Sequence, residues 1–464
     1  MFQIDKDKPV SLAEQIVAQL ASRIETGKLA EGARLPSVRQ LADKLGVSLF
    51  TIVTAYERLV AKGLVESRAG QGSFVARRSQ NEASQPRIEV VIPTLMSAEG
   101  FAHHALETQQ PRLPASSGFL PAEWFEGVIN PTTIRRLLKP GAEGTMPAPV
   151  QGSHALREKL AIRLGQAGMA VTAGHILVTQ GATHAFELIA QAVLPRGSHV
   201  LVEDPGYFVI RRQLEAAGLH CIALPRQADG PDLEMLDQLA TRYKPSAIFT
   251  QTLLHNPTGG NTSLGRSHKL LSLAAKHDIW VVEDDVYGDL TDAAAVRLAQ
   301  LDEFQRVFHV GSFTKVLNPG MRVGYVVPPL NWLPALQEQK MLSVLTGSAF
   351  DEALVADCLA SGRFRKHVQQ LRHRLGRARS RALAALEHIG LQVVSGARDG
   401  MFLWVRLPAG HHSSQWAQAA QAEGILLASG KLFSMSDEGE QFIRLNAAYA
   451  SDPTLLKFFQ RLMG

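Results

Sequence analysis

The sequence is poor in the features that mark secreted and membrane proteins. Its 464 residues include only two cysteines, Cys221 and Cys358, too few for a disulfide framework or a thiolate metal site. No apolar run reaches the roughly 18 residues that a membrane-spanning helix needs. The first residues also lack the apolar stretch of a secretory signal. We therefore expect a cytoplasmic protein with no membrane partner and no bound metal.

Net charge is also small, and its distribution is informative. The formal net charge is +5, and residues 1–78 alone hold 12 Lys and Arg against 8 Asp and Glu. A basic N-terminal segment on a nearly neutral chain indicates a polyanionic partner for that segment. Apolar residues make up 45% of the chain, which excludes a disordered or collagen-like protein. The length of 464 residues suggests about two to four domains.

The first 78 residues have the pattern of three short helices followed by a hairpin. Apolar residues recur every four positions over 11–26, and Ser37 and Ser48 are placed to cap two further helices. Gly46 ends the second helix, and residues 64–75 have the pattern of two strands around a Gly-containing turn. This order predicts a winged helix-turn-helix domain over residues 1–78.

Four short segments carry a family resemblance in this region: Leu35–Ala42, Gly46–Ser48, Ala55–Leu59 and Gly70–Val75. Together they resemble the GntR family of winged-helix DNA-binding domains. The resemblance implies that Arg39, Ser48 and Thr51 contact phosphates or base edges in the major groove. It also implies that the wing around Gly72 approaches the adjacent minor groove.

The expected recognition helix departs from that family at its first residue. Arginine is common after the capping serine, whereas this chain has Leu49 followed by Phe50. The helical pattern leaves Leu49, Phe50 and Val53 pointing away from the core of the domain. Our hypothesis is that base readout depends on apolar contacts with thymine methyl groups. The competing interpretation is that these side chains pack on another domain when no DNA is bound.

The rest of the chain has the pattern of a linker and an α/β body. Residues 79–114 are polar and contain Pro and Ser, as in interdomain linkers. Six strand-like segments then alternate with helical patterns: His175–Thr179, His199–Glu203, Ser246–Thr250, Ile279–Glu283, Arg306–Val310 and Arg322–Val327. We expect a mainly parallel sheet over about 150–330, with a ligand at the carboxyl ends of its strands. A smaller α+β part is expected over about 331–464.

Four polar clusters follow these predicted strands: Gly181–Thr183, His255–Gly259, Glu283–Tyr287 and Ser312–Arg322. Each alone has an ordinary structural explanation, such as a strand-to-helix turn or a solvated acidic loop. In this order they resemble the fold-type I pyridoxal phosphate (PLP) enzymes of the aspartate aminotransferase superfamily. The resemblance extends from about residue 115 to the end of the chain, so the body is expected to span 115–464.

The resemblance implies a role for each of several side chains. Lys315 would form an imine with the aldehyde of the cofactor, and Asp284 would pair with its pyridine nitrogen. Asn256 and Tyr287 would bind the phenolic oxygen of the ring, and Tyr207 would stack on its face.

Further residues are implied at the two ends of the ligand. Those expected to hold the phosphate are Gly181, Ala182, Thr183, Ser312 and Arg322. Arg444 is placed where these proteins bind the carboxylate of a substrate. One departure concerns Pro147, which stands about where the family commonly has a tyrosine that reaches the neighbouring subunit's phosphate.

A GntR-like N-terminus joined to an aminotransferase-like body resembles the MocR subfamily of bacterial regulators over nearly the whole chain. The resemblance implies a cytoplasmic homodimer that binds double-stranded DNA under the control of PLP or of an amine or amino acid that reacts with it. An alternative remains open, in which the chain is a competent PLP-dependent aminotransferase with an autoregulatory DNA-binding domain.

Overall fold

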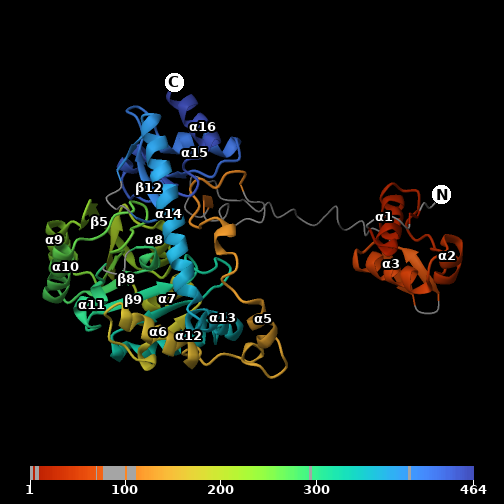
Figure 1. Ribbon diagram of the computed structural model, residues 1–464, viewed down its shortest axis with the longest axis horizontal. Helices are drawn as coiled ribbons and strands as arrows, with labels where there is room; N and C mark the ends of the chain where they lie inside the picture. Colours follow the sequence, from red (N-terminus) through yellow and green to blue (C-terminus); the bar gives the residue numbers. More distant parts are fainter. Residues whose placement is uncertain are drawn as a thin grey trace. The chain divides into compact units, whose positions relative to one another are not determined.

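The computed structural model of the chain describes residues 4–5, 10–68, 71–76, 100–101, 111–291, 295–394 and 399–464. The chain divides into two compact units, residues 1–91 and 92–464, which we call the head and the body (Figure 1). Within the described ranges, no helix combines the length and the apolar character that a membrane span requires.

The head is a winged helix-turn-helix, which confirms the prediction. Its elements are α1 (Leu12–Glu25), α2 (Val38–Leu45), α3 (Leu49–Ala61), β1 (Val65–Arg68) and β2 (Gly72–Val75), with the two strands antiparallel. Local sequence sets the helix ends: Ser37 and Gln40 form a reciprocal capping box before α2, and Gly46 ends α2 with a left-handed φ of 61°. The Ser48 side chain caps α3 by accepting a hydrogen bond from the Thr51 N–H.

An eight-stranded sheet forms the centre of the body. Its strands are β3 (Leu177–Thr179), β4 (His199–Asp204), β5 (His220–Gln227), β6 (Gly230–Pro231), β7 (Ala247–Thr250), β8 (Trp280–Asp284), β9 (Val307–Ser312) and β10 (Gly324–Val327). The order across the sheet is β3-β10-β9-β8-β7-β4-β5-β6. The run from β9 to β5 is parallel, whereas β10 is antiparallel to both of its neighbours. The predicted mainly parallel sheet is confirmed, and β5 and the two-residue strand β6 were not among the predicted strands.

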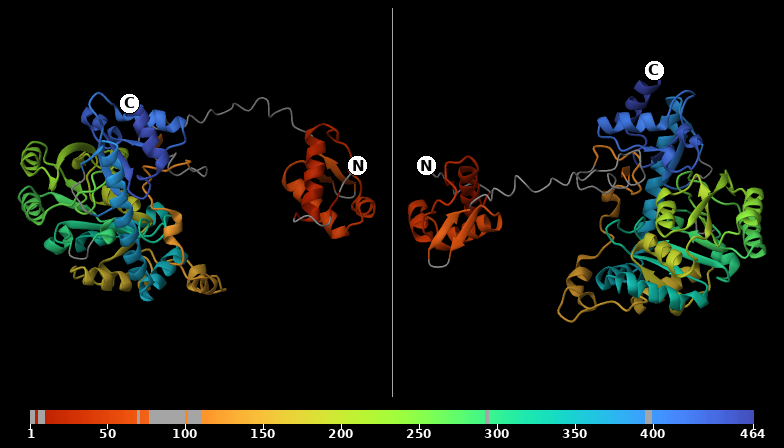
Figure 2. Two further views of the ribbon diagram at one scale, coloured as in Figure 1. Left: turned by 45° about the horizontal axis from the view of Figure 1, so that its top comes forward. Right: turned by 180° about the vertical axis from the view of Figure 1, so that it is seen from behind.

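Apolar side chains on both faces of this sheet are covered by helices (Figures 1 and 2). Strand residues alternate between the two layers, so that Val200 and Val202 face one core cluster while Leu201 faces the other. One layer contains α7 (Gly181–Ala192), α8 (Phe208–Ala216) and α12 (Leu333–Val344). The other contains α6 (His154–Gln166), α9 (Leu233–Tyr243), α10 (Leu264–Lys276) and α11 (Leu298–Asp302). Burial on both faces explains the nearly continuous apolar runs of the strands.

The C-terminal part of the body contains a second, antiparallel sheet. Its order is β11 (Gln392–Val393), β12 (Phe402–Arg406), β14 (Phe442–Asn446) and β13 (Ala428–Ser429). Further α-helices among the described residues of the body are α5 (Pro131–Leu137), α13 (Ala349–Ala360), α14 (Arg363–His388), α15 (Ser413–Ala422) and α16 (Pro453–Met463). The long helix α14 runs from the large sheet's layers to the small sheet (Figure 1).

Residues 113–116 are hydrogen-bonded to the small sheet, at the end of β14 and just before β13. The Leu113 carbonyl accepts a hydrogen bond from the Leu426 N–H at 2.9 Å, and the Ala115 carbonyl accepts one from the Asn446 N–H at 2.8 Å. The Ser116 N–H donates to the Leu426 carbonyl at 2.9 Å. This pairing carries the chain from residue 113 directly to the carboxyl ends of the large sheet's strands, where the polar clusters lie.

Gly324 provides a test of how tightly β10 packs on the turn before α7. A Cβ at this position would lie 2.6 Å from the carbonyl carbon of Gly181 and 3.0 Å from the Ala182 nitrogen. We expect Gly324→Ala to lower the free energy of unfolding of the body by about 1–3 kcal/mol, because backbone atoms cannot move aside cheaply. Calorimetric melting of the whole chain measures the change.

The matched control is Gly165→Ala, in helix α6, where a Cβ meets nothing within 4 Å. There we expect no loss, and a gain of up to about 1 kcal/mol from helix propensity. Equal melting temperatures for the two variants would contradict the close packing.

Candidate cofactor site and DNA-binding surface

The expected cofactor residues all lie at the carboxyl ends of strands or in the turns that follow them. Gly181 follows β3, Asp284 ends β8, Asn256 follows β7 and Tyr207 follows β4. Lys315 follows β9, whose neighbours in the sheet are β8 and β10. Because parallel strands end at the same edge of a sheet, these side chains are brought to one region from distant parts of the sequence.

A turn with little room for side chains begins helix α7. Gly181 has a φ of +80°, and a Cβ on it would lie 2.8 Å from Nη2 of Arg322. The guanidinium therefore lies beside the first N–H groups of the helix, which have no partner within the helix itself. Ser312 is buried, and its hydroxyl is hydrogen-bonded to that of Thr314 at 2.9 Å. A glycine turn, a helix N-terminus and an arginine together suit a phosphate group.

Ala182 and Thr183 continue this turn into the first residues of α7. Thr183 is exposed, and its backbone carbonyl accepts a hydrogen bond from Gln213 Nε2 at 2.7 Å. The structure thus places all five expected phosphate residues around the junction of β3, α7, β9 and β10.

Lys315 has the environment of a lysine that can act as a nucleophile. Its Nζ donates a hydrogen bond to the Gly118 carbonyl at 3.0 Å and lies 4.2 Å from the centre of the Phe119 ring. Burial lowers the pKa of the Lys315 ammonium to about 7, and the charges of Arg444 and Arg322 act in the same direction. A substantial fraction of the amine is therefore neutral near neutral pH, as nucleophilic attack requires.

Asp284 is buried in the same region. One carboxylate oxygen accepts a hydrogen bond from Gln251 Nε2 at 3.1 Å, and the other accepts one from the Val286 N–H at 3.2 Å. Burial raises the pKa of Asp284 to about 7. A cationic ring nitrogen placed against this carboxyl would favour its ionised form, because an opposite charge nearby lowers a carboxyl pKa.

Arg444, in β14 of the small sheet, is buried beside the loop that follows β7 of the large sheet. It is 2% exposed, and it donates from Nη1 to Asn256 Oδ1 at 2.9 Å and from Nη2 to the Ser116 carbonyl at 2.6 Å. Its guanidinium carbon lies 4.4 Å from the Phe402 ring centre and 4.7 Å from that of Phe433. Burial lowers the pKa of Arg444 to about 10, so the group stays cationic at neutral pH.

Two tyrosines and a phenylalanine complete the surroundings of Arg444. Tyr207 is half-buried and Tyr287 is buried, and desolvation raises the pKa of both phenols. The Tyr287 ring lies 5.9 Å from Lys315 Nζ. The Phe101 ring lies 5.9 Å from the Arg444 guanidinium carbon and packs edge-on against Phe208, with ring centres 6.1 Å apart.

Several residues of this region were not identified from the sequence. Gln251 contacts Asp284, and the carbonyls of Ser116 and Gly118 accept from Arg444 and Lys315. The carbonyl contacts carry no side-chain signal. The position of Gln251, five residues before Asn256 and directly after β7, could have drawn attention to it.

Pro147, the departure noted above, is exposed and lies next to the exposed Met146. A proline has no side-chain donor, so it provides no hydrogen bond to a phosphate from this position.

The expected DNA-contacting residues of the head lie on its surface. Arg39, Ser48 and Gly72 are exposed, and the Ser48 hydroxyl is hydrogen-bonded to that of Thr51 at 2.8 Å. Leu49 is exposed to 50%, Phe50 to 78% and Val53 to 38%. The prediction that these three apolar side chains point away from the head's core is confirmed.

Comparison with known proteins places both units. Residues 141–462 match the aminotransferase class I and II family, and residues 12–75 match the gntR family of bacterial regulatory proteins. The chain is 28% identical to YdfD of Bacillus subtilis, named as an uncharacterized HTH-type transcriptional regulator, over 97% of this chain and 95% of that protein. It is 29% identical to the probable rhizopine catabolism regulatory protein MocR of Rhizobium meliloti, over 92% and 87% of the two chains.

A solved structure agrees with the fold of the body. It is LysN, the α-aminoadipate aminotransferase of Thermus thermophilus, complexed with N-(5'-phosphopyridoxyl)-L-leucine. The TM-score is 0.69 at 26% identity, with 75% of this chain and 91% of LysN covered. The chain therefore belongs to the aminotransferase class I and II family and carries a GntR-type winged helix-turn-helix at its N-terminus, the architecture of the MocR subfamily.

Proposed function

We propose that this chain is a cytoplasmic, DNA-binding transcriptional regulator whose body binds PLP at Lys315 and senses PLP itself or a small amino compound there. The observation that carries the proposal is the presence, in one polypeptide, of a GntR-type head and a partly buried lysine with a lowered pKa in the loop that also carries Arg322, the neighbour of the Gly181 turn. Relatives that match over nearly the full chain are named as transcriptional regulators.

The residues present fit PLP by their chemistry. The cradle at Gly181, which a Cβ would fill, and the adjacent Arg322 suit the phosphate. Asp284 suits the pyridine nitrogen, and the Asn256 amide, held by Arg444, suits the phenolic oxygen. LysN, which shares this fold, was solved with a phosphopyridoxyl amino acid.

Bound PLP would supply an electrophilic aldehyde carbon, and Lys315 would be the residue whose amine holds it. The protein's own contribution is to hold Lys315 partly neutral and to offer a cationic group near it. Arg444 is that group, and we assign it the carboxylate of an amino acid effector. A ligand that binds the two states of the body unequally shifts their populations, which is how occupancy would change DNA binding.

We further propose that the body forms a homodimer. Several large apolar side chains of the body are exposed on α5, on the loop after Glu143–Thr145 and on α12 with the turn that follows it: Leu138, Met146, Leu342 and Leu345. Exposed apolar groups of this kind are typical of surfaces that a partner covers.

A second candidate function is transamination, with the head serving autoregulation. The presence of Lys315, Asp284 and Arg444 in one region favours it. Against it stands Pro147, which provides no donor where the family commonly has a tyrosine. We place regulation first because the relatives matched over nearly the full chain are named as regulators.

Covalent capture of PLP tests the assignment of Lys315. After addition of PLP and borohydride, we expect one phosphopyridoxyl group per chain on Lys315, located by peptide mass spectrometry. Because the pKa of Lys315 is about 7, the capture rate should rise with pH through that value as the neutral amine accumulates.

Lys340 is the internal control for that experiment. Burial lowers its pKa to about 8, and its Nζ donates to the Val178 carbonyl at 2.8 Å. Lys340 is thus a second buried lysine with a lowered pKa, to which the resemblance assigns no role. Labelling of Lys340 to the same extent as Lys315 would refute a specific PLP site at Lys315. Continued labelling of the Lys315→Ala variant would refute it as well.

Turnover separates a sensor from an enzyme. With PLP-loaded protein, an amino acid and a 2-oxo acid, we expect the visible absorbance to change once, with less than about one product per chain. We also expect the affinity for DNA to change on the same addition. Repeated turnover, with DNA affinity unaffected by the amino acid and by PLP, would support the aminotransferase instead.

Thymine methyl groups are the expected targets of Leu49. Using duplexes selected from a random pool for tight binding, we expect Leu49→Ala to weaken binding by about 1–3 kcal/mol. Replacing the contacted thymines by deoxyuridine, which lacks only the methyl group, should weaken the wild-type protein similarly and the variant little.

The control for that substitution is Val60→Ala, which removes an exposed apolar side chain from the last turn of the same helix. It should leave binding unchanged. Equal binding of thymine and uracil duplexes by the wild-type protein would rule out methyl readout.

A further inference from the structure

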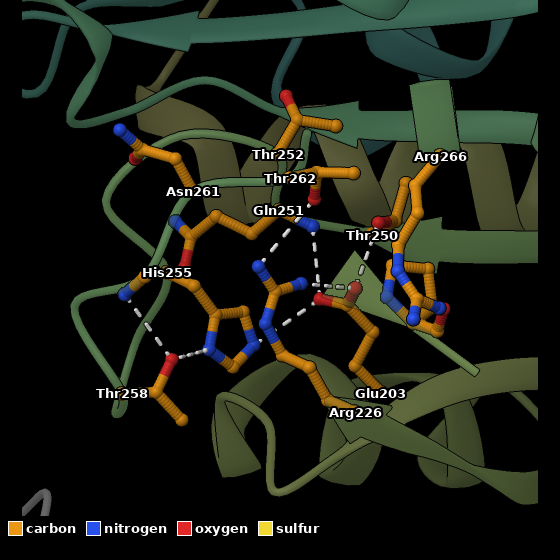
Figure 3. A network of polar contacts seen from close by, with 12 residues as sticks. Glu203, Arg226, Thr250, Gln251, Thr252, His255, Thr258, Asn261, Thr262 and Arg266 are labelled. Atoms are coloured by element: carbon orange, nitrogen blue, oxygen red, sulfur yellow. Dashed lines mark hydrogen bonds and ion pairs between the residues drawn. The ribbon is translucent and has the colours of Figure 1, made fainter. Parts of the chain in front are cut away.

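Figure 3 shows a buried group of charged side chains around Glu203. Gln251 joins this group to Asp284, one of the expected cofactor residues. Glu203 of β4 and Arg226 of β5 form an ion pair with Nη1 and Oε1 2.6 Å apart, and their side chains are 3% and 1% exposed. His255, after β7, places its Nε2 3.1 Å from the other Glu203 oxygen. Three neighbouring strands of the large sheet thus meet at one carboxylate.

Both oxygens of Glu203 are fully engaged. Oε1 also accepts a hydrogen bond from the Thr250 hydroxyl at 2.9 Å, and Oε2 also accepts one from the Gln251 N–H at 3.1 Å. Although burial raises the pKa of Glu203, Arg226 and His255 together lower it to about 2. Burial and the charge of Arg226 lower the pKa of His255 to about 4, so at neutral pH the group contains one anion and one cation.

Gln251 connects this charge pair to the cofactor residues. Its backbone N–H donates to Glu203, and its side-chain Nε2 donates to Asp284 Oδ2 at 3.1 Å. Its side-chain Oε1 accepts from the Asn256 N–H at 2.5 Å. One residue therefore contacts the buried carboxylate and two of the residues that we assign to the cofactor ring, Asp284 and Asn256.

The charge of Glu203 also acts on Asp284 through space. It is one of the charges that raise the pKa of Asp284, after burial and the neighbouring Asp285. If Arg226 did not compensate it, Asp284 would be harder to ionise. A buried ion pair adds little stability compared with apolar residues of similar size. A gain in stability therefore does not explain why this pair is buried beside the cofactor residues.

We propose that Arg226 is a positioning residue for the cofactor, because it neutralises Glu203 and so allows Asp284, which Gln251 holds in place, to pair with the pyridine nitrogen. The proposal rests on the proposed function in one respect, namely that PLP binds against Asp284. Arg226 itself does not contact the cofactor in this scheme and acts through Glu203 and Gln251.

Charge-balance variants of the whole chain test the proposal, with PLP affinity as the measurement. Arg226→Met removes the cation and leaves Glu203 uncompensated, so the dissociation constant for PLP should rise by about tenfold for each unit by which the Asp284 pKa rises. Glu203→Gln keeps the acceptor and removes the anion, so affinity should be equal to or higher than that of the wild type. The double variant should recover most of the loss.

Arg266→Met is the matched control. Arg266 is a neighbouring arginine whose guanidinium bonds Asp229 at 2.7 Å and the Pro231 carbonyl at 2.8 Å, not Glu203. The Arg266→Met variant should bind PLP with the affinity of the wild type. Melting curves without PLP show whether each variant is folded.

The outcomes distinguish the possible failures. If both single variants lost affinity alike, or if the double variant were no better than Arg226→Met, a structural role would explain the data and the proposal would be wrong. If Arg226→Met did not fold, Glu203→Gln and the double variant would still decide, since each must bind PLP at least nearly as well as the wild type. If the wild type bound no PLP, the proposed function itself would fail.

Discussion

The site depends on the exclusion of water from two opposite charges, the Lys315 ammonium and the Asp284 carboxylate. Burial brings the pKa of each to about 7, from opposite directions. Each group can therefore change between its charged and neutral forms at a small cost in free energy. Each can then pair with a ligand atom of opposite charge or complementary hydrogen-bonding type. The surrounding hydrogen bonds, from Gln251 and to Gly118, keep the two groups in place without neutralising them.

Sheet topology makes this exclusion possible. The strands that carry Asp284 and precede Lys315 are neighbours, β8 and β9, in the middle of a sheet covered by helices on both faces. Their carboxyl ends are covered from the other side by residues of the small sheet and by residues 116–119. Lys315 and Gly118 are hydrogen-bonded although 197 residues separate them in the chain.

Local patterns in the sequence were sufficient to predict most of the elements and the polar clusters that follow the strands. The cofactor roles of residues such as Lys315 and Asp284 came from the family resemblance and stay predictions. Apolar runs predicted six of the eight strands of the large sheet, and the serine caps predicted α2 and α3. Strand β5 was missed because its burial is irregular and its apolar run is interrupted by Pro225 and Arg226. The roles of Ser116 and Gly118 could not be predicted, since backbone carbonyls carry no residue-type signal and their partners are distant in sequence. The Arg226–Glu203 pair required knowledge of strand order, which periodicity does not provide.

The hydrogen bond from Arg444 Nη2 to the Ser116 carbonyl has a mechanical consequence. An incoming carboxylate that took this donor would release the carbonyl, while the Ser116 hydroxyl still bonds the backbone of Arg444. The backbone hydrogen bonds of Leu113, Ala115 and Ser116 do not involve the Arg444 guanidinium, so they would persist. Binding of a carboxylate would therefore exchange a single contact of this segment while its path beside the small sheet stays the same.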